Sequence, residues 1–268
     1  MLCIFFGLFG LVLGSFLNVC ILRLPLGESI ARPRSHCRQC NQPIAARDNL
    51  PVLSWLLLGA ACRACGGRIS WRYPAIELAT CALFVISCLH FSSTWLAAGW
   101  ALLCFLLLGL AMMDAETLLL PDAFTLPGLG AGILFAALRP GLTRGDWAWQ
   151  QALLATERAL LAAVVAALTL LLIAGAYWLA RRRMGMGLGD VKLLAMLAAW
   201  LGLPQTAEVL FLAVITGALY GLGMIVAQRK KQPASQLPVP FGTMLSVAGI
   251  YSIFLGQRTL HWYMQLFR

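Results

Sequence analysis

Long apolar stretches recur along almost the whole chain, and they limit its possible folds more than any other feature. Each is long enough, or nearly so, to cross the roughly 30 Å hydrocarbon layer of a bilayer as a helix. Helices are favoured because a backbone in lipid must satisfy its own hydrogen bonds. The sequence therefore predicts an all-α polytopic membrane protein with about eight transmembrane helices. The stretches lie at 2–22, 75–91, 95–113, 123–138, 159–180, 191–203, 207–227 and 241–255.

Composition supports a membrane environment. The chain has 268 residues, of which 61% are hydrophobic and only 11% are charged, far from the values of an ordinary soluble domain. Two stretches are less regular, because 123–138 contains Pro127 and 191–203 is short. The first stretch lacks the basic start and the cleavage site of a signal peptide, so we expect it to remain as a helix.

Basic residues gather in three of the loops between the predicted helices. The net charge of +10 is typical of some nucleic-acid-binding proteins, but this clustering indicates topology instead, and we expect no nucleic acid partner. If the helices alternate in direction, the three loops share one side, which the positive-inside rule assigns to the cytoplasm. Both termini are then external. The basic residues of these loops are Arg23, Arg32, Arg34, Arg38, Arg47, Arg63, Arg68, Arg72, Arg181, Arg182, Arg183, Arg229, Lys230 and Lys231.

Two aspartates stand at the edges of apolar stretches in a chain with only ten acidic residues. Asp114 ends the third predicted helix and Asp190 begins the sixth, so both fall at the cytoplasmic boundary of the membrane. A carboxylate at the edge of hydrocarbon is costly and often marks a functional site. A pair of aspartates is also suited to acid–base chemistry on a peptide bond.

The largest polar stretch, residues 23–74, contains two Cys-x-x-Cys pairs. Cys37 and Cys40 form the first and Cys62 and Cys65 the second, with a spacing typical of four-cysteine zinc sites. The alternatives are two disulfides or four free thiols, and a cytoplasmic location weighs against disulfides. We expect a structural Zn²⁺ that supplies much of the folding energy of this small cytoplasmic domain.

Other residues could take part in, or stand apart from, the metal site. His36 precedes the first Cys pair and is an alternative ligand, although a surface role is the simpler interpretation. The five remaining cysteines lie in apolar stretches, where we expect small core or lipid-facing side chains. These are Cys3, Cys20, Cys81, Cys88 and Cys104.

Several motifs occur in an order that resembles the type IV prepilin peptidases, bacterial inner-membrane enzymes of pilus assembly and type II secretion. The resemblance covers most of the chain, and its specificity comes from the order rather than from any one motif. The motifs are Gly14-Ser15-Phe16-Leu17-Asn18-Val19 with Arg23-Leu24-Pro25, the two Cys pairs, Arg47-Asp48-Asn49-Leu50-Pro51, Arg72-Tyr73-Pro74 with Glu77, Asp114 with Leu120-Pro121-Asp122, Gly187-Leu188-Gly189-Asp190 with Lys192, and Pro240-Phe241-Gly242.

The resemblance implies an aspartic peptidase of the GxGD kind with Asp114 and Asp190 as its catalytic pair. Its substrates would be prepilins or pseudopilins, cut after a leader glycine on the cytoplasmic side of the inner membrane. The cysteine region further implies a second activity, methylation of the new N-terminus with S-adenosylmethionine. The domains would be helix 1 at 1–22, the zinc domain at 23–74 and the peptidase domain at 75–268.

The residues around the aspartates fit this chemistry. Two close carboxylates share a proton, so that one activates water while the other polarises the scissile carbonyl. Gly187 and Gly189 would let backbone and substrate approach closely. Asp190, at the positive end of a helix, is our expected base.

Four further charged residues have more than one interpretation. Glu77 could face the site, pair with a basic residue or contact substrate, and Lys192 could pair with a carboxylate or reach the interface. We expect Glu116 to lie in a solvated loop and Asp122 to cap the following helix. No sequence pattern identifies the residues that bind the methyl donor.

Two other functions use the same features. A transporter could use Asp114 and Asp190 as a proton or cation relay, although both lie at one boundary and no internal repeat is visible. A structural membrane scaffold could present the metal domain to a partner. Composition and topology leave peptidase and transporter nearly equal, and the ordered motifs favour the peptidase.

Overall fold

A computed structural model of the chain describes residues 1–144, 148–182, 186–227 and 239–266. Within these ranges the regular structure is helical, apart from two isolated β-bridges. Six of the described helices are long and apolar enough to cross a membrane. The chain is therefore a multi-pass membrane protein. Four basic residues used to predict its topology lie outside the described ranges, namely Arg183, Arg229, Lys230 and Lys231.

Each of the predicted apolar stretches lies largely within one helix, although 191–203 runs past the end of α7 at Leu201. α5 continues through Pro127, whereas α7 has 14 residues, which is about 21 Å of helix and too short to span hydrocarbon alone. Of the eight long helices that the structure describes, α7 and α9 are not among the six candidate membrane spans. The long helices are α1 (Leu2–Arg23), α3 (Arg72–His90), α4 (Thr94–Thr117), α5 (Asp122–Arg144), α6 (Trp149–Arg181), α7 (Leu188–Leu201), α8 (Leu203–Ala227) and α9 (Phe241–Gln265), and the short ones are η1 (Leu24–Leu26), η2 (Ala46–Asp48) and α2 (Leu53–Leu57).

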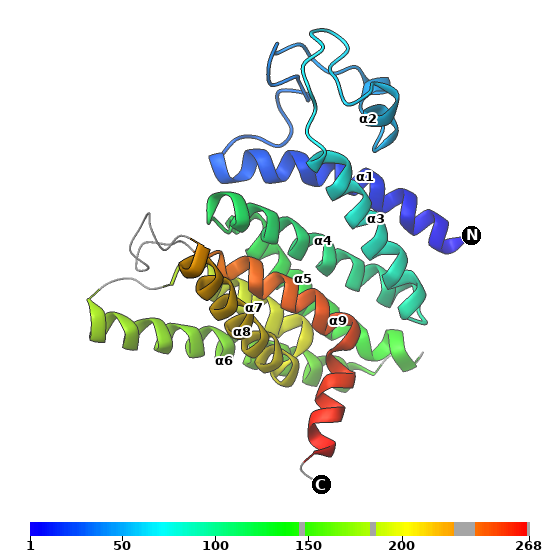
Figure 1. The fold of residues 1–268 in the computed structure, drawn as a ribbon. Coiled ribbons are helices and arrows are strands. Elements are labelled where there is room, and N and C mark those ends of the chain that lie inside the picture. Colours follow the sequence, from blue (N-terminus) through cyan, green and yellow to red (C-terminus); the bar gives the residue numbers. More distant parts are fainter. Residues whose placement is uncertain (145–147, 183–185, 228–238, 267–268) are drawn as a thin grey trace. The chain divides into compact units, whose positions relative to one another are not determined.

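The chain forms two compact units, Met1–Phe105 and Leu106–Arg268. The first unit contains α1, α3 and the polar stretch that carries α2. The second contains α5 to α9, and α4 begins in the first unit and ends in the second (Figure 1).

Close packing of α1 against α3 organises the first unit. A Cβ atom on Gly14 would lie 2.7 Å from Glu77 Cα, and one on Gly10 would lie 2.9 Å from Cys81 Cα. Only glycine allows the two backbones to approach so closely, as in other small-residue contacts between membrane helices. The antiparallel register places Glu77 at the same end of the pair as the polar stretch.

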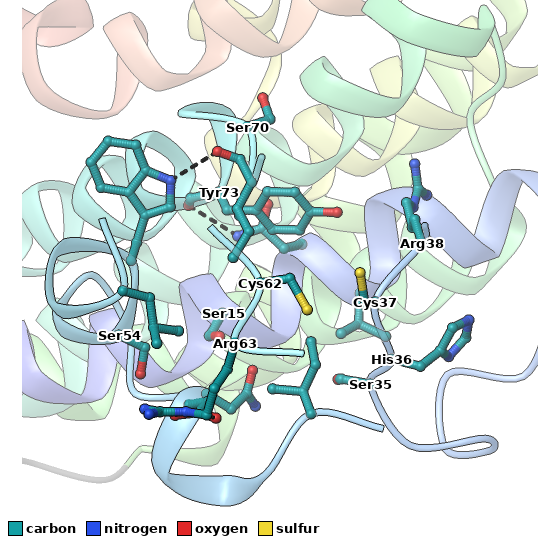
Figure 2. Close-up of a pocket in the computed structure, with 18 of the residues that line it drawn as sticks. Ser15, Ser35, His36, Cys37, Arg38, Ser54, Cys62, Arg63, Ser70 and Tyr73 are labelled. Atoms are coloured by element: carbon teal, nitrogen blue, oxygen red, sulfur yellow. Dashed lines mark hydrogen bonds and ion pairs between the residues drawn. The ribbon is translucent and has the colours of Figure 1, made fainter. Parts of the chain in front are cut away.

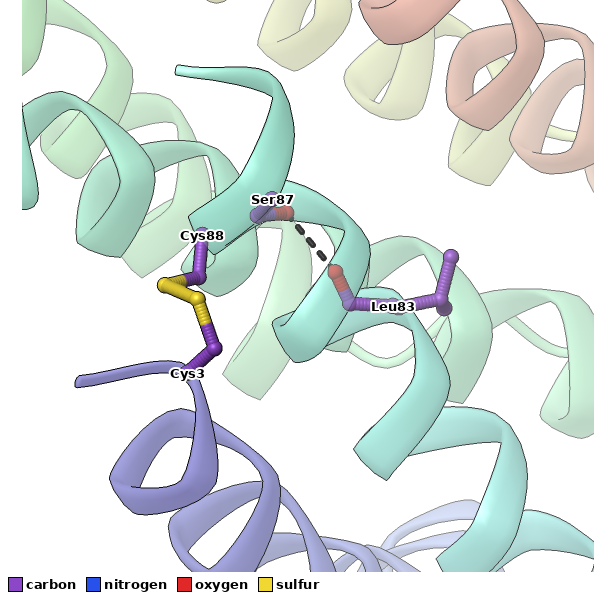
Figure 3. The surroundings of a disulfide bond; sticks show 4 residues. All are labelled: Cys3, Leu83, Ser87 and Cys88. Carbon is purple, nitrogen blue, oxygen red and sulfur yellow. Dashed lines mark hydrogen bonds between the residues drawn. A yellow bond between two sulfur atoms is a disulfide. The ribbon is translucent and has the colours of Figure 1, made fainter. Parts of the chain in front are cut away.

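A disulfide joins the two helices at their other end. Cys3 at the start of α1 bonds to Cys88 near the end of α3 (Figure 3). Both cysteines were predicted to be small core or lipid-facing side chains, and for these two the prediction is wrong. Their helical positions, 85 residues apart in sequence, become neighbours only once α1 and α3 pair.

α7 is the core helix of the second unit. Its residues from Leu193 to Leu201 are all buried, and it contacts α5, α6, α8 and α9. Trp200 of α7 donates its indole N–H to Gly128 O of α5 at 2.8 Å and packs against the Phe135 ring. Enclosure by protein explains how so short a helix exists within a membrane protein.

A polar cluster connects α8 and α9. Glu208 of α8 accepts hydrogen bonds from Ser252, at 2.9 Å, and from Thr259 of α9. Gln205 of α8 donates to Ser252 O at 3.2 Å. Because a carboxylate in an apolar segment is stable only with partners, these contacts fix the register of α9, the helix whose first turn reaches the aspartates.

Large apolar side chains cover the outer faces of several helices. On α6, most leucines, valines and isoleucines are exposed, while its buried positions are mainly alanines. This inverts the pattern of a soluble protein and matches a helix that faces lipid. Exposed apolar residues of α6 include Leu160, Leu161, Val164, Leu168, Leu172 and Ile173.

Candidate functional site

The first of the two aspartates is held by the N-terminus of α9. Asp114, in the last turn of α4, is only 4% exposed. Its Oδ2 accepts the backbone N–H of Thr243 at 2.6 Å and lies 3.0 Å from the Thr243 hydroxyl. The first N–H groups of a helix have no partner within the helix. Asp114 therefore caps α9 from a distant part of the chain.

The second aspartate lies in the first turn of another helix. Asp190, which is 9% exposed, belongs to α7, and its N–H donates to Gly187 O at 3.2 Å. Asp190 and Asp114 are close enough to interact electrostatically. Both carboxylates thus lie beside the positive ends of helices, where negative charge is stabilised.

Leu120 fills the space between the segments that carry this pair. A Cβ atom on Gly189 would lie 3.0 Å from Leu120 Cβ, and one on Gly242 would lie 2.8 Å from Leu120 Cδ1 and 3.1 Å from Asp114 Cγ. The two glycines therefore make room for the same leucine. As a result, residues 114–120, 187–190 and 241–243 form one site within the second unit.

Nearby charged residues lie around this site rather than in it. Lys192 Nζ is 2.6 Å from Asp122 Oδ1, and both side chains are well exposed. This is one of the two alternatives predicted for Lys192, pairing with a carboxylate. Two expectations for nearby acidic residues were wrong: Asp122 is the first helical residue of α5 rather than the cap before it, and Glu116 is exposed but lies in the last turn of α4 rather than in a loop.

The four predicted cysteine ligands of the first unit converge. The Sγ atoms of Cys37, Cys40, Cys62 and Cys65 all lie within 4.8 Å of one another, and those of Cys37 and Cys65 are 3.9 Å apart. A tetrahedral zinc with Zn–S bonds of 2.3 Å requires sulfurs about 3.8 Å apart. The donor set and its geometry therefore fit Zn²⁺. His36 is outside this cluster, and its Nδ1 lies 3.2 Å from Arg34 O.

Backbone turns build each half of the cluster. Asn41 N–H donates to Cys37 O and Gly66 N–H to Cys62 O, both at 2.8 Å. Asn41 and Gly66 have φ values of +57° and +69°, which Asn and Gly adopt most readily. Each turn directs two thiols to the same point.

The thiols do not ionise equally. Backbone hydrogen bonds from Cys40 and Gln39 lower the pKa of Cys37 to about 6. A backbone hydrogen bond from Gly67 acts to lower the pKa of Cys65, but hydrogen bonds with Cys40 and the other thiols, together with burial, raise it to about 11. A bound metal would overcome this difference, because it binds the thiolate form of each cysteine.

A cavity of about 870 Å³ lies beside the cysteine cluster in the first unit (Figure 2). Its walls are the polar stretch, the end of α1 and the start of α3. Glu77 is buried in one wall and accepts the N–H of Val52 at 2.7 Å. Asn18 is buried in another and donates to Tyr73 O at 3.1 Å. Glu77, one of the predicted supporting residues, therefore faces this cavity and belongs to a different unit from the aspartates.

Comparison with known proteins identifies relatives of both units. Residues 8–91 match the bacterial peptidase A24 N-terminal domain, and residues 100–222 match the type IV leader peptidase family. Proteins named prepilin leader peptidase/N-methyltransferase from Aeromonas salmonicida (strain A449), Dickeya chrysanthemi and Pseudomonas aeruginosa are 36%, 37% and 34% identical to the chain. The alignments cover 96%, 92% and 96% of this chain and 92%, 90% and 92% of the relatives.

The chain belongs to the type IV leader peptidase family. This confirms the resemblance drawn from the motifs and favours the peptidase over the transporter. Asp114 and Asp190 lie in the part that matches the type IV leader peptidase family, whereas the four clustered cysteines and the cavity lie in the part that matches the N-terminal domain. No solved structure is significantly similar to the chain.

The roles of two residues at the aspartate site were not predicted from the sequence. Thr243 follows the Pro240-Phe241-Gly242 motif directly, but one sequence does not show that α9 begins against α4. Leu120 belongs to the Leu120-Pro121-Asp122 motif, but as the last of three consecutive leucines after α4 it gave no indication of a packing role. Both become recognisable only from their contacts with Asp114, Gly189 and Gly242.

Proposed function

We propose that the protein removes the leader of type IV prepilins or type II secretion pseudopilins and then methylates the new N-terminus. Its relatives named prepilin leader peptidase/N-methyltransferase support both activities. The observation that carries the proposal is the convergence of two buried aspartates, Asp114 of α4 and Asp190 of α7, beside two helix N-termini.

In this mechanism Asp114 and Asp190 hydrolyse the peptide bond that follows a leader glycine. Two neighbouring carboxylates share one proton. The ionised aspartate takes a proton from water, which attacks the scissile carbonyl, while the protonated aspartate donates a hydrogen bond to the carbonyl oxygen. Because the two titrate as a pair, the roles belong to the dyad, although the position of Asp190 in the first turn of α7 favours it as the base.

Residues around the dyad position the two aspartates or give the substrate access to them. Thr243 holds Oδ2 of Asp114, and this restrains the plane of the carboxylate. Gly187 is exposed just before α7, and a Cβ atom added to it would lie 3.8 Å from Asp190 Oδ2. There the substrate backbone can approach Asp190. Gly189 and Lys192 act indirectly, through the Leu120 contact and the Asp122 ion pair respectively.

The active site is assigned to the cytoplasmic face of the bacterial inner membrane. The positive-inside rule supports this side, because the polar stretch and the C-terminal end of α6 carry most of the described arginines. The chain would cross the membrane up to eight times, with α7 enclosed by its neighbours. Zinc bound by Cys37, Cys40, Cys62 and Cys65 would hold the cytoplasmic domain together, and its four ligands leave no open position for catalysis.

Methyl transfer requires S-adenosylmethionine, which supplies an activated methyl group when bound. The N-terminal amine released by cleavage accepts that group. The two reactions are thus sequential, with the peptidase step creating the substrate of the second.

One assay tests the proposed function. The purified protein in detergent is incubated with a full-length prepilin and S-adenosylmethionine carrying a labelled methyl group. We expect loss of the leader and incorporation of label at the new N-terminus. An intact prepilin, together with proton or cation flux in liposomes that depends on Asp114 and Asp190, would support the transporter instead.

A further inference from the structure

Exposed leucines cover one side of the short helix α2 in the polar stretch of the first unit. Leu53, Leu56 and Leu57 are 57%, 60% and 83% exposed. Their spacing of three and four residues places them on the same face of the helix. A patch of large apolar side chains on an otherwise polar segment indicates an interaction surface. We propose that α2 lies in the cytoplasmic leaflet of the bilayer, with these three leucines inserted between the lipids.

The other side of α2 is fixed to the rest of the unit. Ser54, which is buried, donates its hydroxyl to Arg47 O at 3.2 Å and accepts the N–H of Leu50 at 2.9 Å. Trp55 donates its indole N–H to Ile69 O at 3.1 Å. The helix therefore cannot turn its leucines inward without breaking these hydrogen bonds. Polar contacts inside and leucines outside are the pattern of a helix that faces lipid.

A hydrogen bond sets the level at which α2 starts. Val52, the residue before α2, donates its N–H to Glu77 of α3 at 2.7 Å. Glu77 lies in the second turn of α3, which starts at Arg72, and is therefore about 7.5 Å along the helix axis from that start. At this level α3, one of the candidate membrane spans, already exposes Leu78. The start of α2 thus lies beside a transmembrane helix and not beyond its end.

Trp71 marks where the lipid-facing side of α3 begins. This tryptophan directly precedes α3, is 73% exposed and lies two turns from Leu78 on the same side. Tryptophan is enriched at the boundary between hydrocarbon and headgroups. Because Val52 is bonded further along α3 than Trp71, the start of α2 falls on the hydrocarbon side of that boundary.

The charge of the polar stretch fits an anionic membrane surface. Residues 23–74 contain eight arginines but only two acidic residues, Glu28 and Asp48, and Asp48 is paired with Arg63 at 2.7 Å. Arg47, a few residues before α2, is exposed. Basic residues beside exposed leucines are typical of interfacial helices, because anionic lipids of the cytoplasmic leaflet attract them. A lipid surface accounts for the leucines and the arginines, whereas an apolar protein partner accounts only for the leucines.

Photo-cross-linking in a bilayer tests this placement. A photoreactive amino acid replaces Leu57 in the full-length protein, which is reconstituted in nanodiscs of phosphatidylglycerol and phosphatidylethanolamine. After irradiation, mass spectrometry identifies what is joined to the peptide that contains residue 57. We expect phospholipid adducts there and in the positive control, Leu172 of α6, which is 73% exposed. The same amino acid in place of Arg34, exposed near the cysteine cluster, should give no phospholipid adduct.

A second change tests whether the leucines hold the helix in lipid. Leu53→Glu combined with Leu56→Glu places two charges on the proposed membrane face, and we expect the phospholipid adduct at residue 57 to be lost. The hydrogen bonds of Ser54 and Trp55 involve neither side chain, so the fold of the unit should persist. Leu53→Ile combined with Leu56→Ile is the matched control and should keep the adduct.

Other cross-linked products would overturn the proposal. Links from residue 57 to a peptide of the second unit would show that the chain itself covers the leucines, and links to another copy would show a dimer interface. Links to an added prepilin in place of lipid would assign the face to the substrate. Adducts at Leu172 with none at residue 57, or phospholipid adducts that persist in the double glutamate variant, would contradict insertion of the leucines.

Discussion

Thr243 in the first turn of α9 donates its backbone N–H to Asp114 Oδ2 at 2.6 Å, and its hydroxyl lies 3.0 Å from the same oxygen. The hydroxyl is also 3.0 Å from Ala111 O, one turn earlier in α4. One residue therefore connects the end of α4 to the start of α9 at the aspartate proposed to be catalytic. Its role can be tested without removing either aspartate.

Replacing the hydroxyl of Thr243 should slow cleavage. Thr243→Val keeps the shape and the backbone N–H but loses the O–H donor, so we expect kcat for leader cleavage to fall about tenfold with KM nearly unchanged. Thr243→Ser restores the donor and should recover most of the rate.

The matched control for this experiment is Thr216→Val in α8, whose hydroxyl bonds only within its own helix. It should cleave at the wild-type rate. Equal loss of rate in Thr243→Val and Thr243→Ser would argue against a positioning role for the hydroxyl.

Adding a methyl group beside Leu120 should distort the site. Gly242→Ala would place a Cβ 2.8 Å from Leu120 Cδ1 and 3.1 Å from Asp114 Cγ, and overpacking of this kind costs about 1–3 kcal/mol. We expect lower leader cleavage and a lower Tm in detergent. Gly130→Ala in α5, where no atom lies within 4 Å of the added Cβ, should leave both unchanged.

A second change tests whether Leu120 causes the effect. The double variant Gly242→Ala with Leu120→Ala removes the side chain that the new methyl group meets. It should be more active than Gly242→Ala alone. If the double variant is no better, the distortion has another origin.

Loss of one cysteine ligand should release the metal. Cys37→Ser removes one of four thiolates, and we expect zinc content, measured by mass spectrometry, to fall from one ion per chain to near zero with a lower Tm. His36→Ala is the matched control, because His36 adjoins the same turn but lies outside the cluster. Full zinc occupancy in a variant that lacks all four cysteines would refute the assignment.

The two cysteine sets of the first unit should differ in accessibility. Cys3 and Cys88 lie at one end of the α1–α3 pair and the cysteine cluster beyond the other, about 30 Å away along α1. A membrane-impermeant maleimide applied to whole cells should label Cys3 and Cys88 after mild reduction, and Cys62 only after the inner membrane is opened. Labelling of Cys62 in intact cells would reverse the topology.

Much of the helical architecture could be predicted from the sequence, because hydropathy reports directly on helices in lipid. The boundaries of α1, α3 and α8 differ from the predicted stretches by only a few residues. The early start of α6 at Trp149 and the end of α9 at Gln265 were missed, since polar residues at the interface extend a helix without an apolar signal. The convergence of the four cysteines was predicted because they come in two local turns.

Contacts between distant segments could not be predicted in the same way. The sequence indicated that Asp114 and Asp190 lie at the same membrane boundary, but helix packing decides that α9 reaches Asp114 and that Leu120 fits against Gly189. The Cys3–Cys88 pair depends on the register that Gly10 and Gly14 set between α1 and α3. Such information lies in shape complementarity, which a single sequence does not display.

Leader cleavage by the single variants Asp114→Asn and Asp190→Asn tests the central claim most directly. Each keeps the size of the side chain and removes its acid–base function. With Tm and membrane insertion equal to wild type, we predict that both lose at least about a thousandfold in kcat/KM for a prepilin substrate. Wild-type cleavage by either folded variant would contradict the account.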